Sequence, residues 1–322
     1  MKKILSTISI IFVLIVAVFS VTWIYGKNII NSQKLPENSF VNDSFFLAAG
    51  SQSIGYPFRN WEKGEPNLEA ESVLMVDMDS DYVFYEKNSN LRRPIASVSK
   101  LMSALIAQKY IDNGQNILLD KESLHIEGDN GHGLTEGEVF SAEDLTKIML
   151  LASSNKSAYA LANFFGFDQF VAKMNEEAKR FNMTQTSFAE PSGLSMSNQS
   201  TVEDLKKMAQ GIIQENPEIF VITQNVDMQI NSLGDKSSSH LISNINLFSQ
   251  SPKSLEEMGI QYLGGKTGYT DEAKEAYVGI FSIPSSRFSG QKIRVLTIIL
   301  SSENRYKDIE SLLRWIKQAY VF

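Results

Sequence analysis

The chain has 322 residues, of which 43% are hydrophobic and 21% charged, an ordinary composition for a folded protein with a large core. Its net charge of −7 argues against a nucleic-acid partner, because nucleic-acid-binding proteins carry basic surfaces. Cysteine is absent, which excludes disulfides and thiolate metal sites, and the three histidines are scattered, so we expect neither a metal nor a cofactor.

The first 25 residues carry a membrane signal. Lys2 and Lys3 precede an uncharged run from Ile4 to Tyr25, which is about 22 residues long and sufficient to span a bilayer as a helix. The leading lysines favour a cytoplasmic N-terminus, with the rest of the chain on the extracytoplasmic side. Because no A-x-A cleavage site follows, we expect a single-pass anchor in the cell membrane rather than a cleaved signal peptide.

Residues 26–70 predict an extracytoplasmic linker. They are rich in Asn, Ser, Gly, Pro and Glu and show no sustained hydrophobic period. Some of their aromatic side chains, such as Trp61, could pack on the domain that follows.

Regular patterns begin near Ser72. Two strands joined by an Asp-Ser-Asp turn are predicted over residues 72–79 and 81–88. Helices are predicted over residues 94–111, 141–151, 157–165, 168–181 and 201–216, with Ser141, Asp168 and Thr201 as N-terminal caps. Residues 112–140 are expected to form loops and short strands. Late strands are predicted over residues 226–231, 261–265, 276–283 and 294–301, before an amphipathic helix over 305–320.

This order, with strands at both ends and helices between them, predicts an α+β fold. We expect one antiparallel sheet, in which the N-terminal and C-terminal strands pair, packed against a helical subdomain.

The pattern S-x-x-K occurs three times, at Ser97–Lys100, Ser153–Lys156 and Ser289–Lys292. Only the first opens a long apolar helix, just after Pro94, where free N–H groups and the helix dipole favour negative charge. Residues three apart on a helix share a face, so a lysine with a lowered pKa could take the proton of Ser97. The plain structural alternative is a helix start with Lys100 in solvent.

Two further short patterns follow Ser97 in the chain. Ser153-Ser154-Asn155 lies in a break between two predicted helices, where a simple helix-stop turn is the structural alternative. Lys266-Thr267-Gly268 occurs once, after Gly264-Gly265, where a turn leading into a strand is the alternative.

The order S-x-x-K, S-x-N, K-T-G resembles the signature set of penicillin-binding proteins and serine β-lactamases. Longer segments resemble D-alanyl-D-alanine carboxypeptidases, the low-molecular-mass penicillin-binding proteins. These segments are R-R-P-I-A-S-V-S-K-L-M-S-A-L, G-L-T-E-G-E-V-F-S-A-E-D-L-T-K-I-M-L-L-A-S-S-N, S-F-A-E-P-S-G-L-S, H-L-I-S-N-I-N-L-F and G-G-K-T-G-Y-T. The resemblance covers Ser72 to Phe322, so we assign residues 71–322 to a penicillin-binding domain with the β-lactamase/transpeptidase-like fold.

The resemblance implies the roles of the site residues. Ser97 would attack the bond between two D-alanines of a peptidoglycan stem peptide, Lys100 would take its proton, and Ser153 would relay a proton to the leaving amine. Asn155 would bind the substrate amide and help to hold Lys100. The K-T-G strand would bind the substrate through Lys266, Thr267, Gly268 and Tyr269, and the N–H groups of Ser97 and Tyr269 would hold the oxyanion. β-Lactams would acylate the same serine.

Two departures from the family pattern bear on turnover and substrate preference. Leu263-Gly264-Gly265 replaces the usual Asp-Gly-aliphatic run before K-T-G, and Lys156-Ser157 replaces the common Asp-Ala after S-x-N. Three alternatives stay open beside the carboxypeptidase: a D,D-endopeptidase, a weakly catalytic penicillin-binding scaffold or sensor, and a class A-like β-lactamase. The last needs an E-x-x-L-N loop, which none of Glu176, Glu177 and Glu190 provides.

Overall fold

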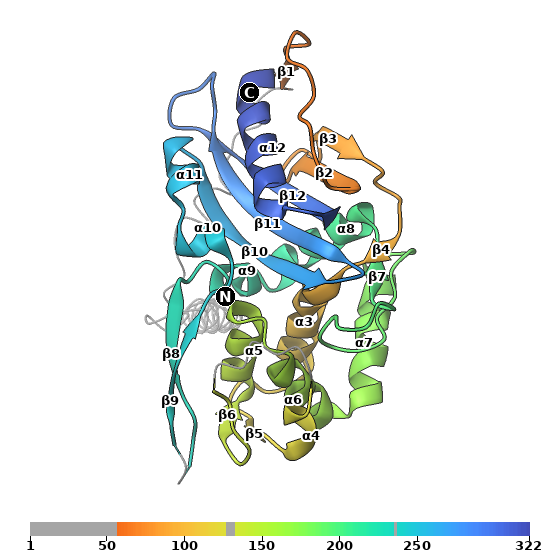
Figure 1. Cartoon of the computed structure of the whole chain (residues 1–322), viewed down its shortest axis with the longest axis vertical. Coiled ribbons are helices and arrows are strands. Elements are labelled where there is room, and N and C mark those ends of the chain that lie inside the picture. The colour runs from red at the N-terminus through yellow and green to blue at the C-terminus, as the bar shows by residue number, and fades with distance from the viewer. Residues whose placement is uncertain (1–56, 127–132, 235–236) are drawn as a thin grey trace, which may run out of the picture. The chain divides into compact units, whose positions relative to one another are not determined.

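A five-stranded antiparallel sheet organises the computed structural model, which describes residues 57–126, 133–234 and 237–322 (Figure 1). The predicted anchor over residues 1–25 and most of the predicted linker lie outside these residues. None of the helices within the described ranges is long and apolar enough to cross a membrane.

The strand order in the sheet is β10-β11-β12-β2-β3. The strands are β2 (Ser72–Asp77), β3 (Val83–Lys87), β10 (Gln261–Thr270), β11 (Lys274–Pro284) and β12 (Lys292–Ser302). The late strand β12 pairs with the early strand β2, with Ile298 opposite Leu74. The predicted pairing of the first and last strands is therefore confirmed, and it leaves β10 at one edge of the sheet.

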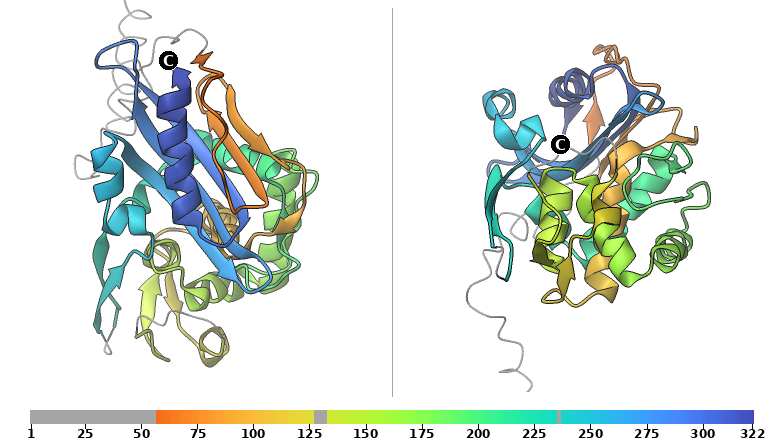
Figure 2. Two further views of the ribbon diagram at one scale, coloured as in Figure 1. Left: turned by 45° about the horizontal axis from the view of Figure 1, so that its top comes forward. Right: turned by 60° about the horizontal axis from the view of Figure 1, so that its bottom comes forward.

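The sheet is covered by helices on both faces (Figure 2). Alternate residues of a strand point to opposite faces. In β2, Leu74 and Val76 pack into the larger core with the helical layer, while Val73 and Met75 pack into a second core beneath α12 (Arg305–Ala319). The near-continuous apolar runs of these strands follow from burial on both faces.

The helical layer lies on the face of the sheet opposite α12. Its longer helices are α3 (Lys100–Tyr110), α5 (Ala142–Leu151), α6 (Asn155–Phe165), α7 (Phe167–Arg180) and α8 (Val202–Glu215), and its short helices are α4 (Lys121–Leu124) and α9 (Glu218–Ile222). Two hairpin-like pairs flank this layer, β5 (Asn116–Leu118) with β6 (Val139–Ser141) and β8 (Asp227–Asn231) with β9 (Ser239–Ser243).

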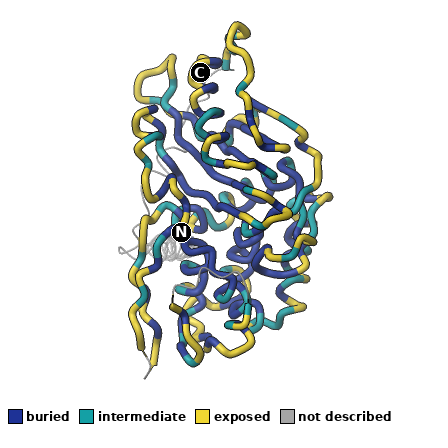
Figure 3. Tube along the Cα trace, viewed as in Figure 1, coloured by how far each residue is buried: buried dark blue, intermediate teal, exposed yellow. Residues whose placement is uncertain are grey.

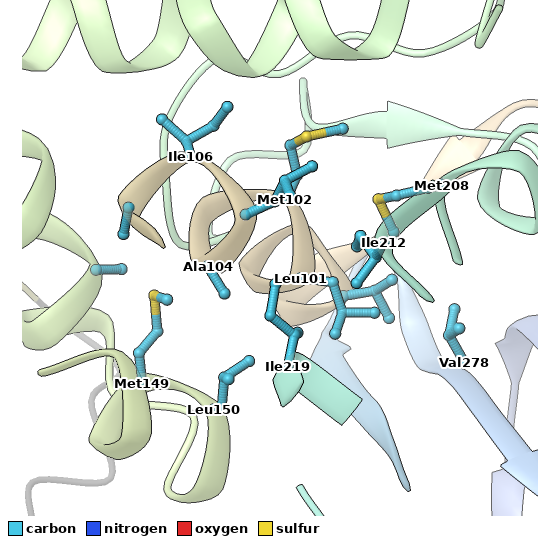
Figure 4. Close-up of a cluster of buried hydrophobic side chains, with 14 of the residues drawn as sticks. Leu101, Met102, Ala104, Ile106, Met149, Leu150, Met208, Ile212, Ile219 and Val278 are labelled. Carbon is cyan, nitrogen blue, oxygen red and sulfur yellow. The ribbon is translucent and has the colours of Figure 1, made fainter. Parts of the chain in front are cut away.

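Helix α3 is the centre of this layer, because it is buried on nearly all sides (Figure 3). Its Leu101 and Met102 lie among side chains from α8, α9 and β11, while its other side faces Met149 and Leu150 of α5 (Figure 4). A helix that is apolar all round must be enclosed by other elements. The residues of its N-terminal turn are therefore fixed in position by the surrounding core.

Several element boundaries differ from the sequence prediction. Strand β10 runs on to Thr270 and so contains the whole K-T-G segment, and α6 begins at Asn155 because the side chain of Ser154 caps it. The prediction that Asp168 caps α7 is wrong. Gly166 occupies the N-cap position without a side-chain hydrogen bond, and Asp168 lies in the first turn. Strand β9 was not predicted.

Residues 57–70, at the end of the predicted linker, pack on the last helix. Strand β1 (Phe58–Arg59) pairs with β13 (Tyr320–Val321), and the indole of Trp315 donates to the carbonyl of Gly64 at 2.8 Å. The Asp308 carboxylate accepts from the backbone N–H groups of Glu69 and Ala70. The small strand pair β4 (Arg93–Pro94) with β7 (Gln199–Ser200) then leads the chain to the start of α3.

Candidate active site

Ser97 lies in a short 3-10 helix, η2 (Ala96–Ser99), that runs directly into α3. The preceding Ala96 has a φ of 46°, a left-handed conformation that non-glycine residues seldom adopt and that concentrates at functional sites. In this turn Ser97 alone is partly exposed, while its neighbours are buried. The turn therefore presents the Ser97 hydroxyl at the surface of a rigid element.

Lys100, the first residue of α3, is fully buried and lies with its Nζ 2.9 Å from Ser97 Oγ. Nζ also donates to Asn155 Oδ1 at 2.6 Å and to the carbonyl of Ser192 at 2.7 Å. Both of these oxygens can only accept, whereas a hydroxyl can also donate. A neutral amine, with two donors and one lone pair, would satisfy both oxygens and turn its lone pair to the proton of Ser97.

Ser153 lies in the junction between α5 and α6, where it has a φ of 58°. Its hydroxyl accepts from Lys266 Nζ at 2.8 Å. Ser154 then caps α6, and Asn155 is the first helical residue, so three consecutive residues each have a separate structural task. We call the η2–α3 turn and the α5–α6 junction the helical wall of the site, and β10 its strand wall.

Lys266 on the strand wall is 2% exposed. Burial lowers its pKa well below the usual lysine value, and the positive charges of Lys100 and Arg305 lower it further. Besides Ser153, its Nζ donates to the carbonyl of Thr267 at 2.9 Å. The pair of lysines predicted from the sequence is thus present in the site.

The two walls enclose a cavity of about 230 Å³. Ser97, Ser153, Asn155, Thr267, Gly268 and Tyr269 all line it, so the structure brings these predicted site residues together. Lys100 and Lys266 lie buried behind Ser97 and Ser153. Among the described residues that line the cavity, none carries a carboxylate.

The two walls approach each other closely at Gly268. A Cβ atom at this position would lie 2.9 Å from the carbonyl oxygen of Ile95 and 2.9 Å from the backbone nitrogen of Ser97. Only glycine therefore lets β10 approach the nucleophile turn. Among the strands that the structure describes, β10 is at the edge of the sheet, so its outer side is available to an extended peptide.

The loop before Ser195 contributes groups that the residue patterns did not identify. The carbonyl of Ser192 holds Lys100, and Gly193 has a φ of 89° with a hypothetical Cβ only 1.9 Å from the carbonyl oxygen of Ala96. The buried Glu190 carboxylate accepts from the N–H groups of Ser192 and Gly193 at 2.7 and 2.6 Å. In the sequence, only the resemblance of the segment that contains Pro191-Ser192-Gly193-Leu194 to the family indicated that this loop belongs to the site.

Arg305, at the start of α12, also lines the cavity and was not predicted. Its guanidinium donates to the carbonyls of Gly268 and Ala276 and pairs with Glu275 at 3.2 Å. It thereby fixes the end of β10 and adds positive charge beside Thr267. Nothing in its sequence neighbourhood distinguishes it from a helix-start arginine.

Close packing explains why glycine occupies positions 264 and 265, just before K-T-G. A Cβ at Gly264, whose φ is 116°, would lie 2.3 Å from the carbonyl oxygen of Phe220, and one at Gly265 would lie 2.4 Å from that of Val278. Thr223 Oγ1 accepts from the N–H of Gly265 at 2.8 Å. The end of α9 thus anchors β10 just before the K-T-G segment.

Ser289 lies in the surface loop between β11 and β12, away from the residues that line the cavity. The glutamates considered for a β-lactamase loop are used elsewhere, since Glu177 pairs with Lys109 and Arg180, and Glu190 holds the loop described above. Glu176 pairs with Lys173 on the surface of α7.

Residues 60–302 match the family model of peptidase S11, D-alanyl-D-alanine carboxypeptidase. The chain belongs to this family. The site described above thus contains the three short motifs that the family resemblance singled out, in one place and in the expected order. Curated relatives of the chain are named either as D-alanyl-D-alanine endopeptidases or as D-alanyl-D-alanine carboxypeptidases.

A D-alanyl-D-alanine endopeptidase of Escherichia coli K12 is 33% identical over 149 residues, which are 45% of this chain and 47% of the relative. The D-alanyl-D-alanine carboxypeptidase DacF of Bacillus subtilis is 32% identical over 64% of this chain and 52% of the relative. The chain thus spans about half the length of these curated relatives.

Among solved structures, the chain is similar to penicillin-binding protein D2 of Listeria monocytogenes in its cefotaxime-bound form. The TM-score is 0.63 at 26% identity, over 78% of this chain and 98% of that one. The α+β penicillin-binding fold with its antiparallel sheet is therefore shared.

Proposed function

We propose that the chain is a serine-type D-alanyl-D-alanine carboxypeptidase that removes the terminal D-alanine from peptidoglycan stem peptides. The observation that carries this proposal is the pair of lysine–serine contacts on either side of one cavity. Lys100 contacts Ser97, Lys266 contacts Ser153, and Asn155, two residues after Ser153, accepts from Lys100.

In the first step, Ser97 Oγ attacks the carbonyl carbon of the D-Ala–D-Ala bond while its proton moves to Lys100 Nζ. The acceptor oxygens of Asn155 and Ser192 keep that amine in place as it becomes charged. The backbone N–H groups of Ser97 and Tyr269 would receive the negative charge of the tetrahedral oxygen.

In the second step, the carbon–nitrogen bond breaks and Ser153 Oγ donates a proton to the leaving amine of D-alanine. Ser153 lies within hydrogen-bond distance of Lys266, whose low pKa makes it a good partner for such an exchange. Water then attacks the ester on Ser97, and one water proton replaces the proton that Ser153 donated. Lys100 returns its proton to Ser97 Oγ as the shortened peptide leaves, which restores the hydroxyl.

The strand wall supplies the recognition of the substrate carboxylate. Thr267 and Lys266 would receive it, and the charge of Arg305 beside them adds to the attraction. A β-lactam presents a carboxylate and a strained amide in a similar arrangement. We therefore expect β-lactams to acylate Ser97 and to be released slowly.

Incubation of the full chain with a stem pentapeptide tests the proposal by mass spectrometry. We expect wild type to release D-alanine and form an acyl adduct on Ser97, and the Ser97→Ala variant to do neither. A labelled but non-hydrolytic protein would instead be a penicillin-binding scaffold or sensor. Rapid turnover of penicillin without peptide hydrolysis would indicate a β-lactamase.

A D,D-endopeptidase is the second candidate, because the E. coli relative carries that name. The chemistry at Ser97 would be the same, with the leaving amine belonging to a second stem peptide. Relative rates on a cross-linked peptide dimer and on a monomeric pentapeptide distinguish the two activities.

For localisation, we propose a single-pass membrane protein with the site on the extracytoplasmic side. The support is the sequence alone, from the two leading lysines and the apolar run that ends at Tyr25. Retention in the membrane fraction after alkaline carbonate, with protease access to the domain only from outside, is the expected result.

A further inference from the structure

The loop of residues 189–198 lies between α7 and β7 in the chain and packs against the start of α3. Its carbonyl at Pro191 accepts from Ser103 Oγ at 2.5 Å, and its carbonyl at Ser192 accepts from Lys100 Nζ at 2.7 Å. Positions three apart on a helix share a face. The loop therefore holds Lys100 and Ser103 from the same side of α3.

Asn198 ties this loop to the turn that carries the nucleophile. Its side chain is fully buried, and its Nδ2 donates to Ser99 Oγ in η2 at 3.0 Å and to the carbonyl of Glu190 at 2.9 Å. Its Oδ1 accepts from the N–H groups of Ala189 and Glu190 at 2.8 and 3.3 Å. The backbone carbonyl of Asn198 accepts from the N–H of Ile95, just before η2, at 3.1 Å. One residue thus joins both ends of the loop to the nucleophile turn.

Glu190 shapes the middle of the loop. It is 7% exposed, and its Oε2 accepts from the N–H and the Oγ of Ser192 at 2.7 and 2.6 Å. Its Oε1 accepts from the N–H groups of Gly193 and Ser195 at 2.6 and 3.3 Å. Backbone N–H groups that converge on one anion form a nest, and hydrogen bonds to a charged acceptor are stronger than neutral ones. The N–H of Ser192 is thereby bound to Glu190 while its carbonyl is bound to Lys100.

The described lining of the catalytic cavity includes Gly193 and Leu194 from this loop, but neither Glu190 nor Asn198. These two side chains can therefore affect the reaction only through the groups that they hold. Lys100 Nζ lies 2.9 Å from Ser97 Oγ, and a displacement of about 1 Å would take the pair out of hydrogen-bond distance.

We propose that Glu190 and Asn198 are positioning residues for the proposed reaction. Glu190 fixes the carbonyl of Ser192, and Asn198 fixes the nucleophile turn. Together they keep the amine of Lys100 in contact with Ser97 Oγ, although neither touches the substrate. The inference rests on the proposed function, because it takes Lys100 as the group that receives the proton of the nucleophile.

Stopped-flow acylation of the full chain by a fluorescent penicillin tests the role of Glu190. Rates over a range of penicillin concentrations separate the Kd of the initial complex from the rate of acylation. We expect Glu190→Gln to slow acylation about 10-fold to 10²-fold and to change Kd by less than about threefold. Glu190→Asp keeps the charge and both acceptor oxygens, so it should acylate faster than Glu190→Gln, although glutamine matches glutamate better in size. The reverse order would overturn the role of the anion.

Glu177 and Asn175 provide matched controls. Glu177 is 4% exposed and pairs with Lys109 towards the far end of α3 at 2.5 Å. The Asn175 amide donates to the carbonyl of Phe188 and accepts from its N–H, so it holds the chain just before the loop. Glu177→Gln and Asn175→Ala should lose stability but acylate at the wild-type rate. Equal slowing in test and control variants would overturn the proposal, because a general loss of stability would then explain it.

The contact between Asn198 and Ser99 can be tested from both sides. Ser99→Ala is a small change that should leave the fold intact even if Asn198→Ala does not fold. We expect each variant to slow acylation about tenfold, and the double variant to be no slower than the slower single variant. A wild-type rate in Ser99→Ala, or additive effects in the double variant, would overturn the role of Asn198.

Hydrogen exchange separates this inference from the proposed function, because it requires no reaction. We expect the backbone amides of residues 95–103 to exchange faster in Glu190→Gln and Asn198→Ala than in Glu177→Gln, and equal exchange there would overturn the proposal. If wild type is acylated by penicillin but releases no D-alanine, the proposed function fails, while the acylation rates still decide the role of the two residues. If wild type is not acylated either, the exchange rates decide it.

Discussion

The helical wall and the strand wall of the site each carry one buried lysine, and the two lysines have different surroundings. Lys100 on the helical wall is surrounded by three oxygens, from Ser97, Asn155 and Ser192. Lys266 on the strand wall has Ser153 and its neighbouring Thr267 carbonyl, with two other cations nearby.

This difference separates two ways of preparing a lysine for proton transfer. Hydrogen bonds orient the Lys100 amine towards Ser97, and burial and like charge lower the pKa of Lys266. The helical wall therefore holds an amine next to the nucleophile, and the strand wall holds a lysine that loses its proton readily next to Ser153. Substitutions on the two walls should have effects of different size and different pH dependence.

The largest effect is expected on the helical wall at the nucleophile. Ser97→Ala should lower D-alanine release by about 10⁴-fold or more and abolish labelling by fluorescent penicillin, because no other described group takes its place. Ser289→Ala is the matched control, since it changes the serine of a second S-x-x-K pattern in a surface loop. An adduct that survives Ser97→Ala would move the nucleophile elsewhere.

The two lysines allow a direct comparison of the walls. We expect Lys100→Met to slow acylation by about 10³-fold and Lys266→Met by about 10²-fold, within the range for loss of a general base or a relay. Stopped-flow measurement of penicillin acylation gives both rates. A greater loss in Lys266→Met than in Lys100→Met would assign the base to the strand wall.

The support beneath the helical wall can be tested at Gly193. Gly193→Ala places a Cβ against the Ala96 carbonyl at a φ of 89°, so the Ser97 turn must move. We expect the variant to lose about 2–4 kcal/mol of stability and to acylate about 10-fold to 10²-fold more slowly. Gly290→Ala, at a φ of 81° with nothing within 4 Å of the Cβ, should lose only about 1 kcal/mol and keep its activity.

The smallest effect concerns stability and belongs to the strand wall. Because folding lowers the pKa of Lys266, the unfolded chain binds more protons than the folded chain between that lowered pKa and about 10.4. The free energy of unfolding of wild type should therefore rise with pH relative to Lys266→Met, by up to about 1.4 kcal/mol per pH unit. Denaturant titrations from pH 7 to pH 10 give this slope, and parallel curves would mean that the pKa is not lowered.

The sequence by itself determined the fold class and most elements of this protein. Apolar runs at both ends of the domain can only be buried on both faces of a shared sheet, and the caps at Ser141 and Thr201 are local signals that the structure uses as predicted. The cap at Asp168 failed because Gly166 ends α6 and starts α7 in one turn, which local side-chain pattern does not reveal.

The order of the three motifs was sufficient to identify the residues that meet in the site, since each triplet is short and local. The Ser192 carbonyl and Arg305 could not be found this way, because a backbone oxygen and a surface-type arginine have no sequence signature. Ser192 contacts Lys100, 92 residues earlier in the chain, and Arg305 contacts Gly268 and Ala276, 37 and 29 residues earlier.

Only the tertiary structure decided that the pKa of Lys266 is lowered. This pKa depends on burial and on groups that come from three separate elements, Lys266 itself, Lys100 and Arg305. It is a property of distances through space, which residue patterns along one segment do not specify.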